Sequence, residues 1–267
     1  MLGAIIGDIV GSIYEFNNYR SKVFNFFSPS CFFTDDSVMT FAVFEALNKS
    51  KGDNKKLEKL AVKEMQKYGS IYPNMSYGGR FALWLKEKSP KPYNSFGNGS
   101  AMRVSAVSYF ANSLDEVKNL SKIVTSVSHN HEEGIKGAEA TAVAVFLALQ
   151  GKSKQEIKEY IEDNYYSLDY DYEDLKKNYF FNETCQNTVP QAIYCFLISE
   201  DFEDSIRIGV SIGGDTDTLC AITGAIAEAY YGIDSKMREK ALGFLDKNLL
   251  KKYNEFSKIF KDKIKII

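Results

Sequence analysis

Two short acidic clusters, far apart in the chain, carry the residue types that bind hard cations. The first is Thr34-Asp35-Asp36-Ser37, and the second is Gly213-Gly214-Asp215-Thr216-Asp217-Thr218. Each stands directly before an apolar run in which a helix is expected to begin. Closely spaced carboxylates and hydroxyls supply the oxygen ligands that Mg²⁺ and similar ions prefer. Two helix N-termini of this composition could therefore meet around a pair of metal ions.

The same acidic residues have a simpler interpretation as helix caps. Asp at the start of a helix accepts hydrogen bonds from free backbone N–H groups and is favoured by the helix dipole. Either cluster alone favours a cap such as Asp215 or Asp217. The repetition of the pattern at Asp35 and Asp36 is what favours a metal centre.

The first predicted helix runs from Leu2 to Phe16 and has a face made of glycine. Gly3, Gly7 and Gly11 recur every four residues, so they share one side of the helix. Glycine in a helix costs about 1 kcal/mol relative to alanine, so three of them require a packing reason. We expect a neighbouring helix to approach this face closely.

The same segment carries a polar stripe of Asp8, Ser12 and Glu15, spaced by four and then three residues. Two interpretations of the stripe stay open at this stage. The stripe either faces solvent, as in an ordinary amphipathic helix, or points Glu15 into a site between helices.

Two glycine-containing loops are candidates for binding an anionic ligand. Ser76-Tyr77-Gly78-Gly79-Arg80 precedes a short helical run, and Ser95-Phe96-Gly97-Asn98-Gly99-Ser100 leads through Met102 into another. Such loops can present backbone N–H groups to a phosphate, although the G-K-[ST] ending of a P-loop is absent. Phe96 could stack on a base or a ribose. The alternative is that both are ordinary connections between helices.

The two histidines, His129 and His131, are separated by one residue and precede an alanine-rich helix that is expected to end near Gln150. Their spacing does not place them on one helix face, and the H-E-x-x-H pattern of zinc hydrolases is absent. We therefore expect Ser128 or Asn130 to cap the helix and one histidine to line a pocket.

Composition limits the class of protein. The chain has 267 residues, 45% of them hydrophobic, and a formal net charge of −2, so no basic surface for nucleic acid or anionic membrane is expected. No apolar run approaches ~20 residues, the start lacks the features of a signal peptide, and four cysteines without C-x-x-C spacing indicate reduced thiols in a cytoplasmic protein.

Helical periodicity without strand-like alternation predicts one all-α domain over residues 1–267. The segment from Lys152 to Asn182, which includes the Tyr-rich residues 164–172, is predicted to be a surface helix with a loop that could cover the site. The tail from Lys247 to Ile267 is predicted to be an amphipathic helix.

The motifs, taken in order, resemble the ADP-ribosylglycohydrolase family. They are Gly7-Asp8, Gly11-Ser12, Tyr14-Glu15, Thr34-Asp35-Asp36-Ser37, Gly97-Asn98-Gly99-Ser100-Ala101-Met102-Arg103, Ser128-His129-Asn130-His131 and Gly213-Gly214-Asp215-Thr216-Asp217-Thr218. The resemblance extends from Leu2 to about Ala241. It implies a compact all-α fold and hydrolysis of an N- or O-glycosidic bond between ADP-ribose and an acceptor, with a catalytically silent ADP-ribose-binding protein as the alternative.

The resemblance also implies roles for individual residues. Two Mg²⁺ or Mn²⁺ ions would be bound by Thr34, Asp35, Asp36, Asp215, Asp217 and Thr218, and the catalytic residues would be Glu15, Asp35 and Asp36. Substrate would contact Ser76, Gly78, Gly79, Ser95, Phe96, Gly97, Asn98, Gly99, Ser100, Met102 and His129. Phe96 departs from the family pattern, because relatives that cleave serine linkages have Tyr at this position.

The match of Glu15 to those relatives favours an O-linked acceptor, on a protein or a small molecule. Nucleic acid enters only as an ADP-ribosylated substrate, and no membrane partner is expected. Prenyl-diphosphate synthases also bind Mg²⁺ through acidic helices, but their D-D-x-x-D motif is not completed after Asp36.

Overall fold

Helices α1 and α13 form the central pair, in direct backbone contact. In the computed structural model, which describes residues 1–267, α1 spans Leu2–Gly11 and α13 spans Thr216–Tyr231. A Cβ atom at Gly3 would lie 2.1 Å from the carbonyl oxygen of Gly224, and one at Gly7 would lie 1.9 Å from that of Cys220. No side chain fits at such distances, so the predicted close approach along the glycine face is confirmed.

The first helix is shorter than predicted, because it ends at Gly11 and not at Phe16. The Ser12 hydroxyl donates to the carbonyl oxygen of Ile9 at 2.9 Å, and the Tyr14 N–H bonds to the Gly11 carbonyl in a turn. Glu15 therefore lies on an irregular segment beyond the helix. The continuous polar stripe of one helix face was a wrong expectation, since Asp8 and Glu15 belong to different local structures.

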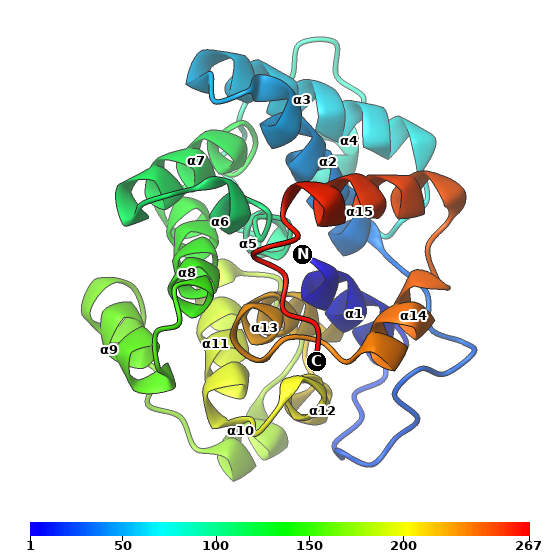
Figure 1. Ribbon diagram of the computed structural model, residues 1–267, viewed down its shortest axis with the longest axis vertical. Helices are drawn as coiled ribbons and strands as arrows, with labels where there is room; N and C mark the ends of the chain where they lie inside the picture. Colours follow the sequence, from blue (N-terminus) through cyan, green and yellow to red (C-terminus); the bar gives the residue numbers. More distant parts are fainter.

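The remaining chain adds helices around this pair, and no strand forms (Figure 1). They are α2 (Asp35–Ser50), α3 (Asn54–Ile71), α4 (Gly79–Trp84), α5 (Gly99–Met102), α6 (Val107–Phe110), α7 (Leu114–Ser126), α8 (Glu132–Leu149), α9 (Lys154–Asn164), α10 (Tyr172–Asn178), the 3₁₀ helix η1 (Cys185–Asn187), α11 (Val189–Ile198), α12 (Phe202–Ile212), α14 (Ser235–Leu242) and α15 (Lys247–Ile259). The predicted all-α fold is confirmed.

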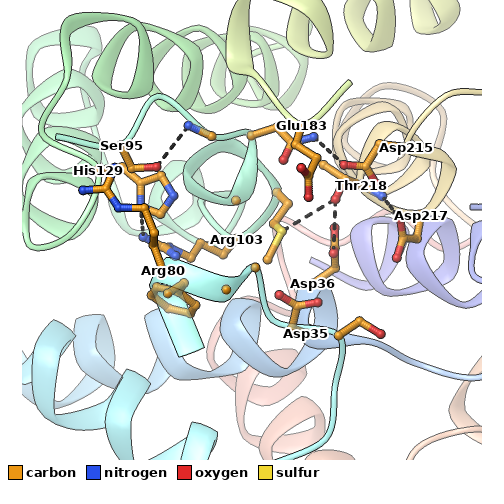
Figure 2. Close-up of a pocket in the computed structure, with 18 of the residues that line it drawn as sticks. Asp35, Asp36, Arg80, Ser95, Arg103, His129, Glu183, Asp215, Asp217 and Thr218 are labelled. Carbon is orange, nitrogen blue, oxygen red and sulfur yellow. Dashed lines mark hydrogen bonds between the residues drawn. The ribbon is translucent and has the colours of Figure 1, made fainter. Parts of the chain in front are cut away.

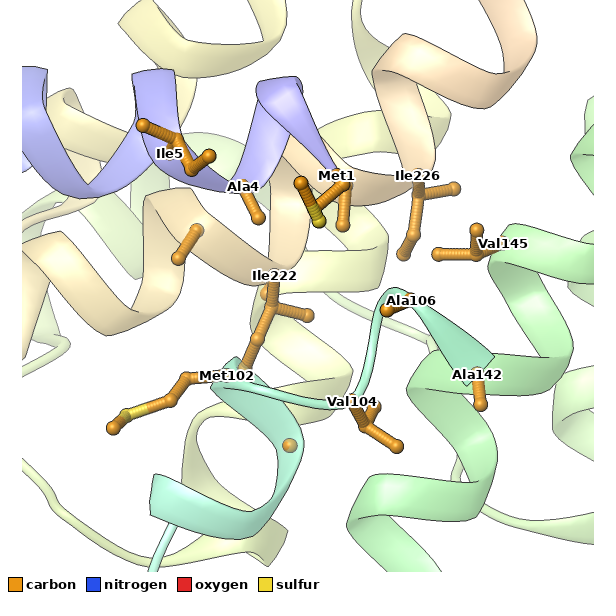
Figure 3. Packing of buried hydrophobic residues seen from close by; sticks show 14 of the residues in the cluster. Met1, Ala4, Ile5, Met102, Val104, Ala106, Ala142, Val145, Ile222 and Ile226 are labelled. Carbon is orange, nitrogen blue, oxygen red and sulfur yellow. The ribbon is translucent and has the colours of Figure 1, made fainter. Parts of the chain in front are cut away.

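One hydrophobic core joins the central pair to its neighbours. Apolar side chains of α1, α13 and α8 meet around the short segment that follows α5, and Figure 3 shows Met1, Ala4, Ile5, Met102, Val104, Ala106, Ala142, Val145, Ile222 and Ile226 in this contact. Small residues on α8 let it pack closely, as the alanine-rich pattern predicts. This shared core fixes the positions of the two acidic helix N-termini relative to each other.

The predicted cap of α8 was wrong. His131, rather than Ser128 or Asn130, precedes α8, and its Nδ1 accepts the Glu133 N–H at 3.1 Å. The Asn130 side chain instead accepts the Asn94 N–H at 2.7 Å. An imidazole nitrogen can cap a helix in the same way as a carboxylate, but residue preferences for caps do not rank it highly.

The Tyr-rich segment is partly structural. Helices α9 and α10 lie at the periphery, as predicted for this stretch (Figure 1). Its Leu168 is buried, however, and Tyr179 packs so close to Gly214 that a Cβ there would lie 2.3 Å from the ring. The end of the segment therefore supports the second acidic cluster directly.

The tail forms the predicted amphipathic helix, α15, whose Leu249, Tyr253 and Phe256 are buried. The four cysteines are all buried and unbridged. No helix has the length and apolar character that a membrane crossing requires.

We expect Gly7→Ala to destabilise the fold, because its methyl group must push the α1 and α13 backbones apart. Overpacking of this kind should cost about 3 kcal/mol or more in urea unfolding. Gly79→Ala is the matched control, since a Cβ at Gly79 meets nothing within 4 Å. Equal stability of the two variants would show that the helices separate freely.

Candidate active site

Asp8 fastens the start of α2 to α1. Its carboxylate accepts the N–H and the hydroxyl of Thr34, at 2.9 and 2.7 Å, and both the N–H (3.0 Å) and hydroxyl of Ser37. Asp8 is fully buried, so the solvent-facing interpretation of this residue was wrong. The bonds fix the first acidic cluster against the helix that packs on α13.

The two acidic clusters meet, as the metal hypothesis requires. Carboxylate oxygens of Asp8, Asp36 and Asp217 lie within 4.8 Å of one another, and so do those of Glu15, Asp215 and Asp217. The Thr218 hydroxyl also donates to Asp36 at 3.3 Å. Because Asp217 belongs to both groups, the two groups form one continuous site between the N-termini of α2 and α13.

Capping does not account for Asp215. It precedes α13, yet its side chain makes no capping hydrogen bond. Its Oδ2 instead accepts the side-chain N–H of Asn98 at 2.7 Å, which ties the second cluster to the Gly97–Gly99 loop. At α2 the cap is Thr34, whose hydroxyl accepts the Asp36 N–H at 3.3 Å.

The cluster carries uncompensated negative charge. Its carboxylates form no ion pair with Lys, Arg or His. Burial and the charge of Asp217 raise the pKa of Asp8 to about 7, and burial with the charges of Asp217, Asp8 and Glu183 raises the pKa of Glu15 to about 8. Burial first, then Asp217, also raises the pKa values of Asp35, Asp36 and Asp215.

These residues fit a divalent metal centre. Asp36 Oδ1 is buried without a hydrogen-bond partner, which is costly unless a cation approaches it. All donors are carboxylate or hydroxyl oxygens, the set that hard divalent ions select. The site can therefore hold divalent metal, with its oxygen donors converging from two helices.

A cavity of about 240 Å³ extends from the acidic cluster between the two glycine-containing loops (Figure 2). The structure brings together most of the predicted site residues along it: Glu15, Asp35, Asp36, Ser76, Gly78, Gly79, Ser95, Gly97, Asn98, Gly99, Met102, His129, Asp215, Asp217 and Thr218. Ser76 and Asn94 adopt positive φ angles of 62° and 55°. Such strain in non-glycine residues is typical of loops shaped for a ligand.

Three predicted site residues do not line this cavity. Thr34 lies behind it, bonded to Asp8. The Ser100 hydroxyl is fully buried and donates to the Gly134 carbonyl at 2.8 Å, so it joins α5 to α8. Phe96 is 43% exposed and packs edge-on against His131 at 5.1 Å, which turns its ring away from the cavity.

His129 is held in one tautomer by Arg103. The Arg103 Nη2 lies 3.3 Å from His129 Nδ1, and the Ser128 hydroxyl lies 2.8 Å from the same nitrogen. A guanidinium can only donate, so Nδ1 accepts and the hydrogen of the neutral ring is on Nε2. Burial and then the Arg103 charge lower the pKa of His129 well below its usual range. Nε2 faces the Gly97–Gly99 loop, 3.6 Å from an ideal Cβ at either glycine.

Arg103 is itself an unusual buried cation. Only 1% of it is exposed, no carboxylate pairs with it, and its Nε and Nη1 have no partner. Its guanidinium lies 5.0 Å from the Phe81 ring centroid, and burial lowers its pKa to about 10. This end of the cavity is therefore positive, whereas the other end holds the carboxylates (Figure 2).

Sequence reasoning missed six residues of the site: Asp8, Arg80, Phe81, Tyr93, Arg103 and Glu183. Asp8 and Arg103 each had a signal, because both lie within motifs that the resemblance singled out, and Arg80 had one because it ends a candidate anion-binding loop. Glu183 had none, since it lies in an irregular charged segment far from any motif. Its position depends on the Asn98 N–H, which bonds to its carbonyl oxygen at 2.8 Å.

The helical fold matches a known architecture. A solved structure described as an ADP-ribosylglycohydrolase-related protein complex superposes with a TM-score of 0.63, at 21% identity, over 94% of each chain. The sequence profile described as ADP-ribosylglycohydrolase matches residues 1–253. The chain belongs to the ADP-ribosylglycohydrolase family and is an enzyme that hydrolyses glycosidic bonds of ADP-ribose.

Curated relatives fall within this family. The chain is 28% identical to ADP-ribosylhydrolase ARH3 of Mus musculus, over 88% of this chain and 83% of that protein. The human protein of the same name is 27% identical over 88% and 85%. ADP-ribosylarginine hydrolase Tri1 of Pseudomonas putida is 24% identical, over 87% of this chain and 70% of that protein.

Divalent metal should stabilise the protein more at high pH than at low pH. Raised pKa values of Asp8 and Glu15 mean that the folded metal-free protein keeps protons that the unfolded chain releases near about pH 4. The stability that these groups contribute is therefore full at low pH and falls as pH rises through about 8. A divalent cation bound among these carboxylates would replace the protons, so we expect Mg²⁺ to raise the melting temperature more at pH 8 than at pH 5.

Thermal unfolding at both pH values, with Mg²⁺ and with chelator, measures this difference. Asp36→Asn should weaken both the pH dependence and the Mg²⁺ response, because it removes one of the buried charges. An equal Mg²⁺ shift at pH 5 and pH 8 would mean that the ion binds elsewhere.

We expect His129 to be neutral in the native protein at about pH 6.5, where an ordinary histidine is half protonated, because burial and Arg103 lower its pKa. Its ring resonances can be followed by NMR in a His131→Asn background, which leaves one histidine and a residue suited to the cap. Arg103→Met should raise the pKa of His129, because the neighbouring charge is removed. A native His129 that titrates near its ordinary pKa would contradict the tautomer assignment.

Proposed function

We propose that the protein is a metal-dependent hydrolase that releases ADP-ribose from an O- or N-linked acceptor. The observation that carries this proposal is the convergence of Glu15 with both acidic clusters at one end of a polar cavity. The names of the relatives, ADP-ribosylhydrolase and ADP-ribosylarginine hydrolase, support the same class of bond.

The proposed metal centre holds two Mg²⁺ or Mn²⁺ ions. Asp35, Asp36, Asp215, Asp217 and Thr218 would bind them, with Thr34 as the remaining predicted ligand. When bound, such ions neutralise the carboxylates, position the ribose hydroxyls and polarise water. Asp8 makes a further contribution, because its carboxylate holds Thr34 in place and lies among the donors.

Glu15 is the proposed acid and base. Its carboxyl group lies with those of Asp215 and Asp217. From there it can donate a proton to the departing acceptor oxygen or nitrogen, or direct the attacking water. It is half-buried on the turn after α1, close to these two carboxylates. Positive charge develops on the ribose as the glycosidic bond breaks.

The opposite end of the cavity suits the ADP portion. Backbone N–H groups of the Ser76–Gly79 loop, the Nε2–H of His129 and the Arg103 cation all favour a diphosphate. Tyr93 and Phe81 provide aromatic surface on the same side. Phe96 and Ser100 take no direct part in this proposal, because neither lines the cavity.

The test is release of ADP-ribose from serine-, arginine- and nucleic-acid-linked conjugates, with Mg²⁺, with Mn²⁺ and with chelator. We expect release from at least one protein linkage, dependent on divalent metal. Asp35→Asn and Asp215→Asn should each lower kcat/KM at least about 100-fold, and Glu15→Gln should lower kcat by a similar factor while ADP-ribose still binds.

Two results would contradict the proposal. Full activity of the metal-free protein would show that the reaction does not require a metal ion. Tight binding of ADP-ribose without cleavage of any conjugate would indicate a binding protein. Folding of each variant is checked by circular dichroism, because Asp35 and Asp215 are nearly fully buried.

A further inference from the structure

An exposed aromatic pair lies beside the carboxylates at the acidic end of the cavity. Phe16 directly follows Glu15, and Phe181 lies two residues before Glu183. The two rings stack, with centroids 5.8 Å apart and planes at 29°. Phe16 is 81% exposed and Phe181 is 41% exposed. We call Phe16, Phe181 and Glu183 the rim surface.

The rim surface is held in place from both sides. The Glu183 carbonyl accepts the Asn98 N–H at 2.8 Å, and the Cys185 N–H bonds to the Phe96 carbonyl at 2.9 Å, which makes an antiparallel bridge between Gly97 and Thr184. Asn98 in turn contacts Asp215. The backbone of Glu183 is therefore positioned relative to the acidic cluster, and its side chain lines the cavity.

No cation of the protein neutralises the rim surface. Glu183 is exposed and forms neither an ion pair nor a side-chain hydrogen bond, although it lines the cavity. Arg20, the cation on the neighbouring segment, donates both of its bonds to the carbonyl oxygens of Ile212 and Tyr179. The surface thus combines aromatic faces with an unpaired carboxylate.

The combination of aromatic rings and an unpaired carboxylate determines which kind of chemical group the rim surface can bind. An anionic group would be repelled by Glu183, and a purely apolar group would bury the carboxylate without a partner. A guanidinium or ammonium group satisfies both features, because it pairs with a carboxylate and is attracted to aromatic faces. The planar guanidinium fits a stacked aromatic pair better than an ammonium does.

We propose that the rim surface recognises a cationic side chain, preferably arginine, next to the ADP-ribosylated residue of a polypeptide acceptor. The inference rests on the proposed function, which places the acceptor beside Glu15. The inference goes further by stating which acceptor sequences the enzyme prefers. The charge distribution of the cavity agrees with a cationic acceptor. In the proposed function its positive end, at Arg103, binds the diphosphate, and its acidic end faces the acceptor (Figure 2).

The test compares matched peptides that carry ADP-ribosylated serine followed by arginine, by citrulline or by glutamate. Citrulline has nearly the shape of arginine without its charge. We expect kcat/KM to be about tenfold higher for the arginine peptide than for the citrulline peptide, and lowest for the glutamate peptide. This preference should weaken as salt is raised, because the rim surface is exposed.

Variants of the rim surface identify the source of the preference. Glu183→Gln and the double variant Phe16→Ala/Phe181→Ala should each bring the arginine-to-citrulline ratio close to one. Phe181→Tyr keeps an aromatic face and should keep the ratio. A control charge change at Glu173, an exposed residue away from the cavity, should also leave the ratio as it is in the native protein.

Affinity separates this inference from the proposed function. Dissociation constants of the same peptides are measured on Glu15→Gln with Mg²⁺, where turnover does not interfere. If the native protein releases ADP-ribose from no conjugate of the serine-, arginine- and nucleic-acid-linked panel, but the variant still binds the arginine peptide about tenfold more tightly, the proposed function is wrong and the rim surface is supported. Equal rates and equal affinities, or no binding of any peptide, would overturn the inference.

Discussion

The backbone contact between α1 and α13 is the constraint on which the rest of the site depends. The glycine face of α1 brings Asp8 to the start of α13, and the Asp8 carboxylate then holds Thr34 and Ser37 at the start of α2. The N-termini of α2 and α13, which are far apart in the sequence, are thereby brought next to each other. Their like charges would separate them, so close packing along the glycine face has to oppose that repulsion.

Much of this arrangement could be predicted from sequence. Apolar periodicity predicts helices, and the repeated acidic motif predicts that two of them share a site, because both signals are local. Three features depended on tertiary contacts and were missed or mistaken. Asp8 looked like part of a surface stripe until its partners on α2 were known, His131 displaced the expected cap, and Glu183 reached the cavity only through a backbone bond to Asn98. Phe96 and Ser100 belonged to the right motif but point elsewhere.

The cavity is electrically polarised along its length. Carboxylates gather at one end, and Arg103, which has no acidic partner, lies at the other. A substrate with a diphosphate at one end and a polyhydroxylated ribose at the other matches this polarity only in one orientation. The neutral, donor form of His129 fits the same scheme, because it offers a hydrogen bond at the end proposed for the diphosphate without adding a charge that would vary with pH.

The separation of α1 and α13 in sequence has a consequence for biosynthesis. Residues 2–11 find their partner only after residues 216–231 have left the ribosome. Contacts between such distant segments form late and slow the folding of a domain, since the intervening chain must be ordered first. Until then the apolar faces of α1 lack their cover, and the nascent chain is exposed to aggregation. Catalytic competence and completion of the core thus arrive together, at the last stage of folding.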